Sequence, residues 1–155
     1  MKNIQIPGLA NSFFFTLDSV SLSLSKIHKP LLEELGITYA QYLIMLLVQE
    51  KDGITATEMS LHLGQSRPAL SPMIKKLESQ NLICRYRDPQ DKRRVCIKLT
   101  DRSNSVLREA ELIPGEALRA CGLDSQAVYE LKSQIDAICQ SLCSPRKTCI
   151  IPSRE

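Results

Sequence analysis

The spacing of hydrophobic residues predicts a chain built mainly of helices. In residues 12–35 they recur at steps of three and four residues, which places them on one face of a long helix. The residues on this face are Phe13, Leu17, Val20, Leu24, Ile27, Leu31 and Leu35. Pro30 lies well inside the segment, so we expect a kink or a break near Lys29.

Two shorter helices are predicted next by their capping residues. Thr38 precedes Gln41 by three positions, and Thr55 precedes Glu58 in the same way. This is the spacing of a capping box, in which the two side chains satisfy backbone amides at the start of a helix. The second helix should end near Leu63, and residues 64–66 then form the turn of a helix-turn-helix.

The helix after this turn, SRPALSPMIKKLESQ (residues 66–80), has two different faces, and we call it the recognition helix. Its apolar face consists of Leu70, Met73, Ile74 and Leu77, and its opposite face of Pro68, Ser71, Pro72, Lys75 and Ser79. One face can therefore pack while the other contacts a partner. Pro68 fits the first turn, where no backbone donor is needed, whereas Pro72 should bend the helix slightly.

A hairpin of two short strands is predicted after the recognition helix. Asn81 is a suitable left-handed stop, and side chains then alternate in LICRYR (82–87) and VCIKL (95–99) around the charged turn DPQDKRR (88–94). In the second strand we expect Val95, Ile97 and Leu99 to point inward, and Cys96 and Lys98 to point outward. This hairpin, which we call the wing, completes a winged helix-turn-helix.

The C-terminal part is predicted to be helical again. A long helix begins after Thr100, is kinked or interrupted at Pro114 and Gly115, and ends near Gly122. The last helix, capped by Asp124 or Ser125, carries apolar residues at alternating steps of three and four that need a partner. These residues are Val128, Leu131, Ile135, Ile138 and Leu142. The fold class is therefore mainly α with a small β wing.

Positive charge is concentrated in the predicted recognition helix and wing. Residues 66–98 hold nine Lys or Arg and three acids, a local charge of +6, whereas the whole chain carries only +3. A helix with small and basic outward residues fits the major groove of duplex DNA, and the arginines of a basic hairpin can reach phosphates or the minor groove. Double-stranded DNA is therefore the partner that the sequence predicts.

The amino-acid composition argues against several other classes of protein. Hydrophobic residues make up 43% of the chain and charged residues 24%, as in an ordinary globular protein, and the low aromatic content of 5% argues against a single-strand stacking surface. No apolar run is long enough to span a membrane, and the start MKNIQIPGLANSFFF lacks the cleavage pattern of a signal peptide. We therefore expect a cytoplasmic protein whose six cysteines are mostly reduced.

Several of these segments resemble the MarR family of bacterial transcriptional regulators. The similarity covers about residues 12–143 and is most specific in DPQDKRRVCIKLT (88–100), which fits the D-P-x-D-x-R pattern of that family's wing. LGITYAQYLIML (35–46) and LSPMIKKLE (70–78) are similar to the OhrR-type organic-peroxide sensors within the family.

The resemblance implies a homodimer that binds a pseudo-palindromic operator. Residues 1–155 would form a single domain of the family, with the winged helix-turn-helix in 36–100, dimerisation helices in 12–35 and 101–143, and a flexible tail in 144–155. Each subunit would present one recognition helix and one wing to DNA. No cofactor is expected.

Ten residues are candidates for DNA contact. The resemblance places Arg93 in the minor groove and gives Asp91 the task of orienting it. Lys92 and Arg94 are candidate phosphate contacts, and Arg67 is the best candidate for a bidentate contact with guanine. The other candidates are Ser66, Pro68, Ser71, Lys75 and Lys76. A solvated hairpin tip and ordinary surface charges are the alternative explanation of these residues.

The chain differs from the OhrR-type sensors at the residue that reacts with peroxide. The reactive cysteine of those sensors would fall in NSFFFTL, where this chain has Ser12 or Phe13, and neither can form a sulfenic acid. Tyr39 matches one of the tyrosines that bind the thiol, and His28 lies near the position of the other. Phe13, His28 and Tyr39 are therefore candidates for a ligand pocket instead. Packing is the commoner role of such residues, in the core for Tyr39 and in the dimer interface for Phe13.

The cysteines offer a weaker candidate for redox sensing. Cys96, predicted to lie beside Lys98, could have a lowered thiol pKa, and Cys139 and Cys143 are one helical turn apart with Cys149 following. Packing as small apolar residues is the simpler explanation for Cys84 and Cys139. Neither the cysteines nor His28 and His62 have the spacing of a metal site.

Three functions remain open at this stage. The first is a dimeric DNA-binding regulator, expected to be a repressor, that is released by thiol oxidation or by a small aromatic or acidic ligand. The second is a thiol-based redox enzyme, which no CxxC motif supports. The third is a winged-helix module that binds another protein. We expect no enzymatic activity.

Overall fold

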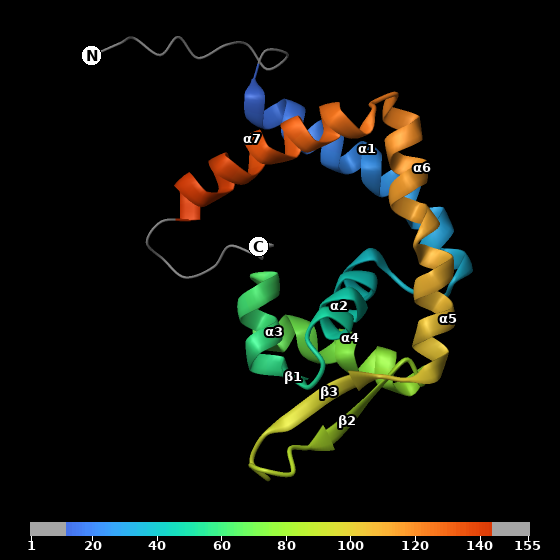
Figure 1. Cartoon of the computed structure of the whole chain (residues 1–155), viewed down its shortest axis with the longest axis vertical. Helices are drawn as coiled ribbons and strands as arrows, with labels where there is room; N and C mark the ends of the chain where they lie inside the picture. The colour runs from blue at the N-terminus through green and yellow to red at the C-terminus, as the bar shows by residue number, and fades with distance from the viewer. Residues whose placement is uncertain (1–11, 144–155) are drawn as a thin grey trace.

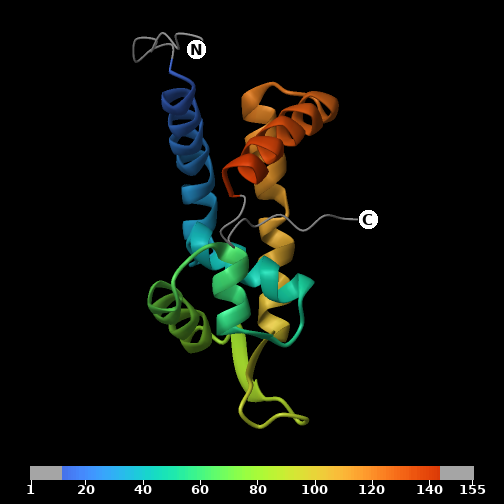
Figure 2. The same ribbon diagram turned by 90° about the vertical axis from the view of Figure 1, so that its left-hand side faces the viewer.

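The computed structural model describes residues 12–143 and is mainly helical with a small sheet, as predicted. Its elements are α1 (Phe13–Glu34), α2 (Tyr39–Glu50), β1 (Ile54–Thr55), α3 (Ala56–Leu63), α4 (Arg67–Ser79), β2 (Ile83–Arg87), β3 (Val95–Leu99), α5 (Asp101–Ala110), α6 (Leu112–Cys121) and α7 (Ser125–Cys143). Figures 1 and 2 show the β2–β3 hairpin projecting at one end and α1, α6 and α7 gathered at the other. α5 and α6 run along one side and connect the two ends.

The helix boundaries follow the predicted caps. The Thr38 hydroxyl accepts from the backbone N–H of Gln41 at 3.3 Å, and the Gln41 side chain accepts from the Thr38 N–H at 2.8 Å. Thr55 and Glu58 form the second capping box in front of α3. Asn81, with φ +55°, is the left-handed stop predicted after the recognition helix, which is α4.

Two expectations about proline are corrected by the structure. α1 continues without a break through Pro30, which lies on its exposed side, where water can donate a hydrogen bond to the carbonyl that loses its partner. The C-terminal interruption falls at Glu111 instead of Pro114 and Gly115. Because Pro114 has no N–H to donate to Ala110, the helix breaks earlier, and Pro114 then lies in the first turn of α6.

The sheet has a third strand that the sequence pattern did not predict. Strand β1 pairs with β3 so that the order is β1-β3-β2, with both pairs antiparallel. The predicted wing hairpin is formed by β2 and β3, with Ile83 opposite Leu99 and Arg87 opposite Val95. Strand β1 was missed because it has two residues and one of them, Thr55, also caps α3.

The extra strand corrects the prediction for Cys96. As the middle strand, β3 places Cys96 between Thr55 of β1 and Tyr86 of β2, and Cys96 is only 3% exposed, whereas Val95 is 43% exposed. The loop before β1 closes over this face, since a Cβ on Gly53 would lie 2.8 Å from the Tyr86 hydroxyl. Cys96 is therefore a packed residue and not an outward thiol.

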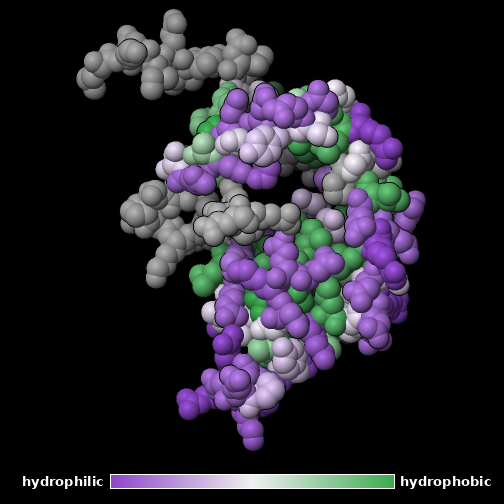
Figure 3. Space-filling view, in the orientation of Figure 1, coloured by the Kyte–Doolittle hydropathy of each residue, from purple (hydrophilic) through white to green (hydrophobic). Residues whose placement is uncertain are grey.

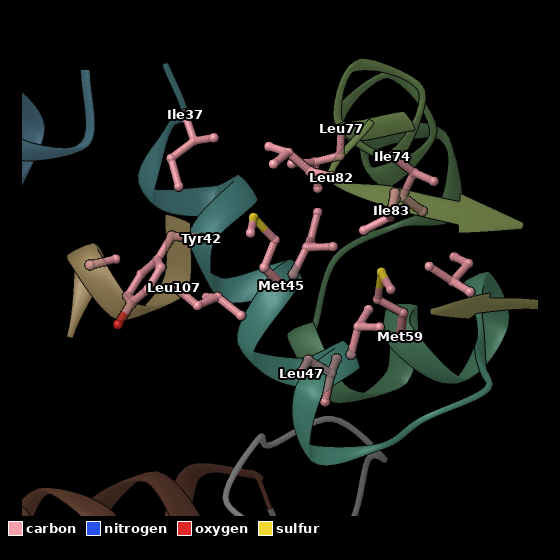
Figure 4. Close-up of a cluster of buried hydrophobic side chains, with 14 of the residues drawn as sticks. Ile37, Tyr42, Met45, Leu47, Met59, Ile74, Leu77, Leu82, Ile83 and Leu107 are labelled. Carbon is pink, nitrogen blue, oxygen red and sulfur yellow. The ribbon is translucent and has the colours of Figure 1, made fainter. Parts of the chain in front are cut away.

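The core joins α2, α3, α4 and the sheet. Figure 4 shows Tyr42, Met45 and Leu47 of α2 pointing into the same cluster as Met59, Leu77 and Ile83. Met45, Met59 and Leu77 are fully buried. Leu107 of α5 packs onto the same cluster, which fixes the recognition helix relative to the C-terminal helices.

None of the described helices is by itself long and apolar enough to cross a bilayer. Together, α1 and α2 have the length and composition of a span, but they are bent by 76° relative to each other. Six residues of α2 are buried in the core.

Candidate nucleic-acid interface

The recognition helix packs by one face and exposes the other, as predicted. Ser66 caps it by accepting from the backbone N–H of Ala69 at 3.4 Å, and Pro68 lies in its first turn. Leu70, Ile74 and Leu77 are buried, while the opposite face is exposed. The exposed residues of this face include Arg67, Pro68, Ser71, Lys75 and Lys76.

A groove joins the recognition helix to the wing. It has a volume of about 560 Å³, and its floor includes Ile74 and Ile97. Arg67 and Ser71 of α4 line it together with Arg85 of β2. Arg85 was not predicted as a site residue, because the alternating pattern identifies it only as a residue of the first strand of the wing. The recognition helix and the wing thus line one continuous groove, in which Arg67, Ser71 and Arg85 are the polar residues.

The wing turn is held by its own backbone and by two aspartates. The Asp88 N–H donates to the Arg94 carbonyl at 3.0 Å, and the Asp91 carboxylate accepts from the backbone N–H of Arg93 at 3.0 Å. The Arg87 guanidinium donates to the Lys92 carbonyl at 3.1 Å. Asp91 therefore shapes the backbone under Arg93. In Figure 3 this end of the molecule is almost entirely hydrophilic.

The basic side chains of this surface divide into two groups. Arg94 forms an ion pair with Glu58 at 3.1 Å, Arg85 forms one with Glu78 at 3.2 Å, and the Lys98 ammonium lies 5.5 Å from the centre of the Tyr86 ring. Arg87 also belongs to the first group, since it donates to the Lys92 carbonyl. Within residues 12–143, the side chains of the second group make no ion pair, hydrogen bond or ring contact. These unpaired cations are Arg67, Lys75, Lys76, Lys92 and Arg93.

Glu58 connects the helix-turn-helix to the wing. One carboxylate oxygen accepts from the N–H and the hydroxyl of Thr55, both at 2.8 Å, and the other accepts from Arg94. The hydrogen bonds from Thr55 are the main cause that lowers the pKa of Glu58, and the charge of Arg94 contributes. The capping box of Thr55 and Glu58 was predicted from the sequence. The contact between the second carboxylate oxygen of Glu58 and Arg94 was not, because the two residues are 36 positions apart in the chain.

This geometry predicts an acid-sensitive contribution to stability. Because the pKa of Glu58 is lower in the folded state, its stabilising effect is complete above the ordinary value of about 4.5 and is lost as pH falls through the folded-state pKa. Glu58→Gln keeps a capping box but has no charge to titrate. In urea unfolding from pH 6 to 3, the stability difference between wild type and Glu58→Gln should shrink towards low pH. A constant difference would contradict the assignment.

Comparison with known proteins identifies the family. A family model described as transcriptional regulator SarA/Rot matches residues 26–110. The organic hydroperoxide resistance transcriptional regulator of Bacillus subtilis (strain 168) is 36% identical over 134 residues, covering 86% of this chain and 91% of that protein. The chain belongs to the MarR family of transcriptional regulators. The family predicted from the wing motif is confirmed.

Solved structures show the same fold in MarR-family proteins. The transcriptional repressor CouR bound to a 23-mer DNA duplex matches with a TM-score of 0.78 and 24% identity, over 87% of this chain and 97% of CouR. A MarR variant from E. coli complexed with operator DNA matches with a TM-score of 0.70 and 24% identity, over 79% and 90% of the two chains. This MarR-family chain is a DNA-binding transcriptional regulator, as the recognition helix and wing predicted.

The candidate ligand residues of this MarR-family chain are only partly brought together. The rings of His28 and Tyr39 stack with centres 5.3 Å apart, and Tyr39 lies 6.3 Å from Tyr42. Burial raises the pKa of Tyr42, helped by nearby Tyr39 and Glu111. Phe13 is separated from His28 by about 22 Å of helix, at 1.5 Å per residue, so within one protomer it cannot share their pocket.

A cavity of about 320 Å³ lies beside Tyr39, at the turn between α1 and α2. Its lining residues are Ser25, Lys29, Leu32, Glu33, Ile37, Thr38, Tyr39 and Ala40. Lys29 and Glu33 form an exposed ion pair at 3.7 Å. Of the three candidate ligand residues, only Tyr39 lines this cavity.

Apart from Cys96, which is buried in β3 of the wing, the candidate redox residues lie on or after α7. Cys139 is half-buried on α7, and Cys143 is the last residue of that helix. Cys149 lies outside the described residues. Ser12 accepts from the Phe15 N–H as the cap of α1, so a structural serine occupies the region of the missing sensor thiol. No group of three His, Cys, Asp or Glu side chains among residues 12–143 could hold a metal ion.

Proposed function

We propose that the chain acts as a homodimeric repressor that binds two half-sites of a pseudo-palindromic DNA operator. In each protomer α4 enters the major groove and the wing reaches the adjacent minor groove or its phosphates. The observation that carries the proposal is the groove in which Arg67 and Ser71 of α4 face Arg85 of β2, because it makes the helix and wing one surface. The DNA-bound structures of CouR and MarR, which share the fold, support this mode.

Four of the five unpaired cations are assigned the principal contacts. Arg93 is assigned to the minor groove and Lys92 to a phosphate, since both project from the wing turn without an acidic partner. Arg67 and Lys75 are assigned to the major-groove side together with Ser71. Arg94 must exchange Glu58 for a phosphate to make its contact, so it should contribute less than Lys92.

Dimerisation is proposed because the helices away from the DNA expose an unusual amount of apolar surface. The exposed apolar residues of α1, α6 and α7 and the loop before α7 include Phe13, Phe14, Phe15, Val20, Leu22, Leu112, Leu118, Leu123, Tyr129, Leu131 and Ile138. A second copy would cover these faces and hold two recognition helices about one DNA turn apart. The proposed layout is a single domain over 1–155, with dimerisation through 12–35 and 101–143.

We further propose a cytoplasmic, non-enzymatic regulator of a stress response. Its effector is a small aromatic or acidic ligand bound near Tyr39 or an oxidant acting on the cysteines of α7. The name of the Bacillus subtilis relative links that protein to organic hydroperoxides. This chain has Ser12 and Phe13 in the corresponding region, so its response to peroxide, if it has one, needs a different thiol.

Binding to non-specific duplex DNA should depend steeply on salt. Each phosphate neutralised by a cation contributes about −0.9 to the slope of log K against log salt. Lys75→Gln should therefore reduce the magnitude of this slope by about 0.9 per bound protomer, measured by fluorescence anisotropy between 50 and 200 mM salt. Lys132→Gln on α7 is the matched control and should leave the slope unchanged. Equal slopes for wild type and Lys75→Gln would argue that α4 faces away from DNA.

A further inference from the structure

The C-terminal end of the recognition helix is joined by a hydrogen bond to the turn between α1 and α2. The Gln80 side-chain amide donates to the Gly36 carbonyl at 2.8 Å, across 44 residues of sequence. The other polar atom of this amide, Oε1, is buried and has no hydrogen-bond partner among residues 12–143, which is costly. The orientation of the amide is therefore determined by its bond to Gly36.

Both ends of this bond are rigid helix terminations. Gly36, with φ +71°, follows α1, and the next residue, Ile37, donates to the Leu32 carbonyl at 3.0 Å. Asn81, with φ +55°, follows Gln80, and Leu82 donates to the Leu77 carbonyl at 3.0 Å in the same pattern. These are two Schellman motifs, and each is backed by a buried apolar pair, Leu32 with Ile37 and Leu77 with Leu82.

The same end of α4 is held from a second side by α5. The Thr100 hydroxyl donates to the Asn81 carbonyl at 2.6 Å, and the Thr100 N–H donates to the Leu82 carbonyl at 3.2 Å. Ser103, fully buried on α5, also donates to the Leu82 carbonyl. The C-terminus of α4 is thus attached to both α1 and α5, which the proposed function assigns to dimerisation.

We propose that Gln80 is a positioning residue that sets the placement of α4 relative to α1, and with it the spacing between the two recognition helices of the dimer. This inference rests on the proposed function. Gln80 follows α4 at its C-terminal end, away from the exposed N-terminal residues that face the groove, so it acts through α4 and not by touching DNA. The bond also links α4 to the turn that lines the cavity beside Tyr39. A ligand that moved this turn would move the Gly36 carbonyl and with it the end of α4.

The test measures how strictly the dimer requires one half-site spacing. The probes are a duplex selected by the wild-type protein from a random pool, and the same duplex with one base pair inserted at its centre. Gln80→Met keeps the side-chain length but loses the donor. The affinity ratio between the two duplexes should fall about fivefold or more in Gln80→Met, while affinity for a non-specific duplex stays within about twofold. Gln49→Met, at an exposed glutamine of α2, is the matched control and should keep the wild-type ratio.

Each outcome decides the inference. A ratio in Gln80→Met equal to that of wild type would overturn the positioning role while leaving DNA binding intact. Failure of the wild type itself to select a duplex or to prefer one spacing would overturn the proposed function. Gln80→Glu, which places an acceptor opposite the Gly36 carbonyl, carries the same expectation and replaces Gln80→Met if that variant does not fold. A loss of unfolding free energy with an unchanged ratio would indicate a purely structural role.

Discussion

Replacing Arg93 by alanine should weaken operator binding by about 1–3 kcal/mol per protomer without changing the stability of the fold. Within the described chain the Arg93 guanidinium has no partner, while its backbone N–H is held by the Asp91 carboxylate at 3.0 Å. The side chain can therefore be removed without breaking a contact inside the protein. The measurement is a competition, followed by fluorescence anisotropy, between the duplex selected by the wild-type protein and a non-specific duplex. It separates a loss of operator affinity from a loss of affinity for all DNA.

Two variants control for charge and for location. Arg93→Lys keeps the charge but cannot make a bidentate contact, so it should recover only the salt-dependent part of the affinity. Arg94→Ala removes a neighbouring arginine that is already paired with Glu58, and it should cost less than Arg93→Ala. If Arg93→Ala bound the operator with the same affinity as wild type, the assignment of the wing to the DNA interface would be wrong.

Replacing Leu77 by alanine should lower the free energy of unfolding by about 2–5 kcal/mol. Leu77 is completely buried, lies on the packing face of α4, and belongs to the apolar pair that backs the end of this helix. Figure 4 shows it beside Leu82 in the cluster of buried side chains. The substitution leaves a cavity where α4, the sheet and α2 meet, so the surrounding residues cannot easily close it.

Urea unfolding at a fixed protomer concentration measures this loss, since the stability of a dimer depends on concentration. Leu61→Ala removes the same atoms from a side chain on α3 that is 59% exposed, and it should change stability by no more than about 0.5 kcal/mol. Equal effects of the two substitutions would mean that α4 is not anchored through Leu77.

Much of the fold could be predicted because its signals are local. The two capping boxes, the stop at Asn81 and the apolar face of α4 each depend on residues a few positions apart. What could not be predicted depends on contacts between distant segments. The pairing of β1 with β3 buries Cys96, and no alternation within β3 alone reveals this.

The candidate DNA-binding site could also be predicted only in part from the sequence. The excess of positive charge in residues 66–98 identifies the surface, but only the folded structure shows which cations are neutralised. Glu58 is 36 residues from Arg94, and Gln80 is 44 residues from Gly36. These contacts change the expected roles of Arg94 and Gln80, and they arise from the packing of α3 against the wing and of α4 against the end of α1.

Hydroxyl-radical footprinting of the wild-type protein on its selected operator tests the central claim most directly. Two recognition helices held by one dimer should protect two patches of backbone whose centres lie about 10–10.5 base pairs apart. Each patch should be flanked by minor-groove protection that disappears in Arg93→Ala. A single protected patch, or two patches whose flanks are the same in Arg93→Ala, would contradict the account.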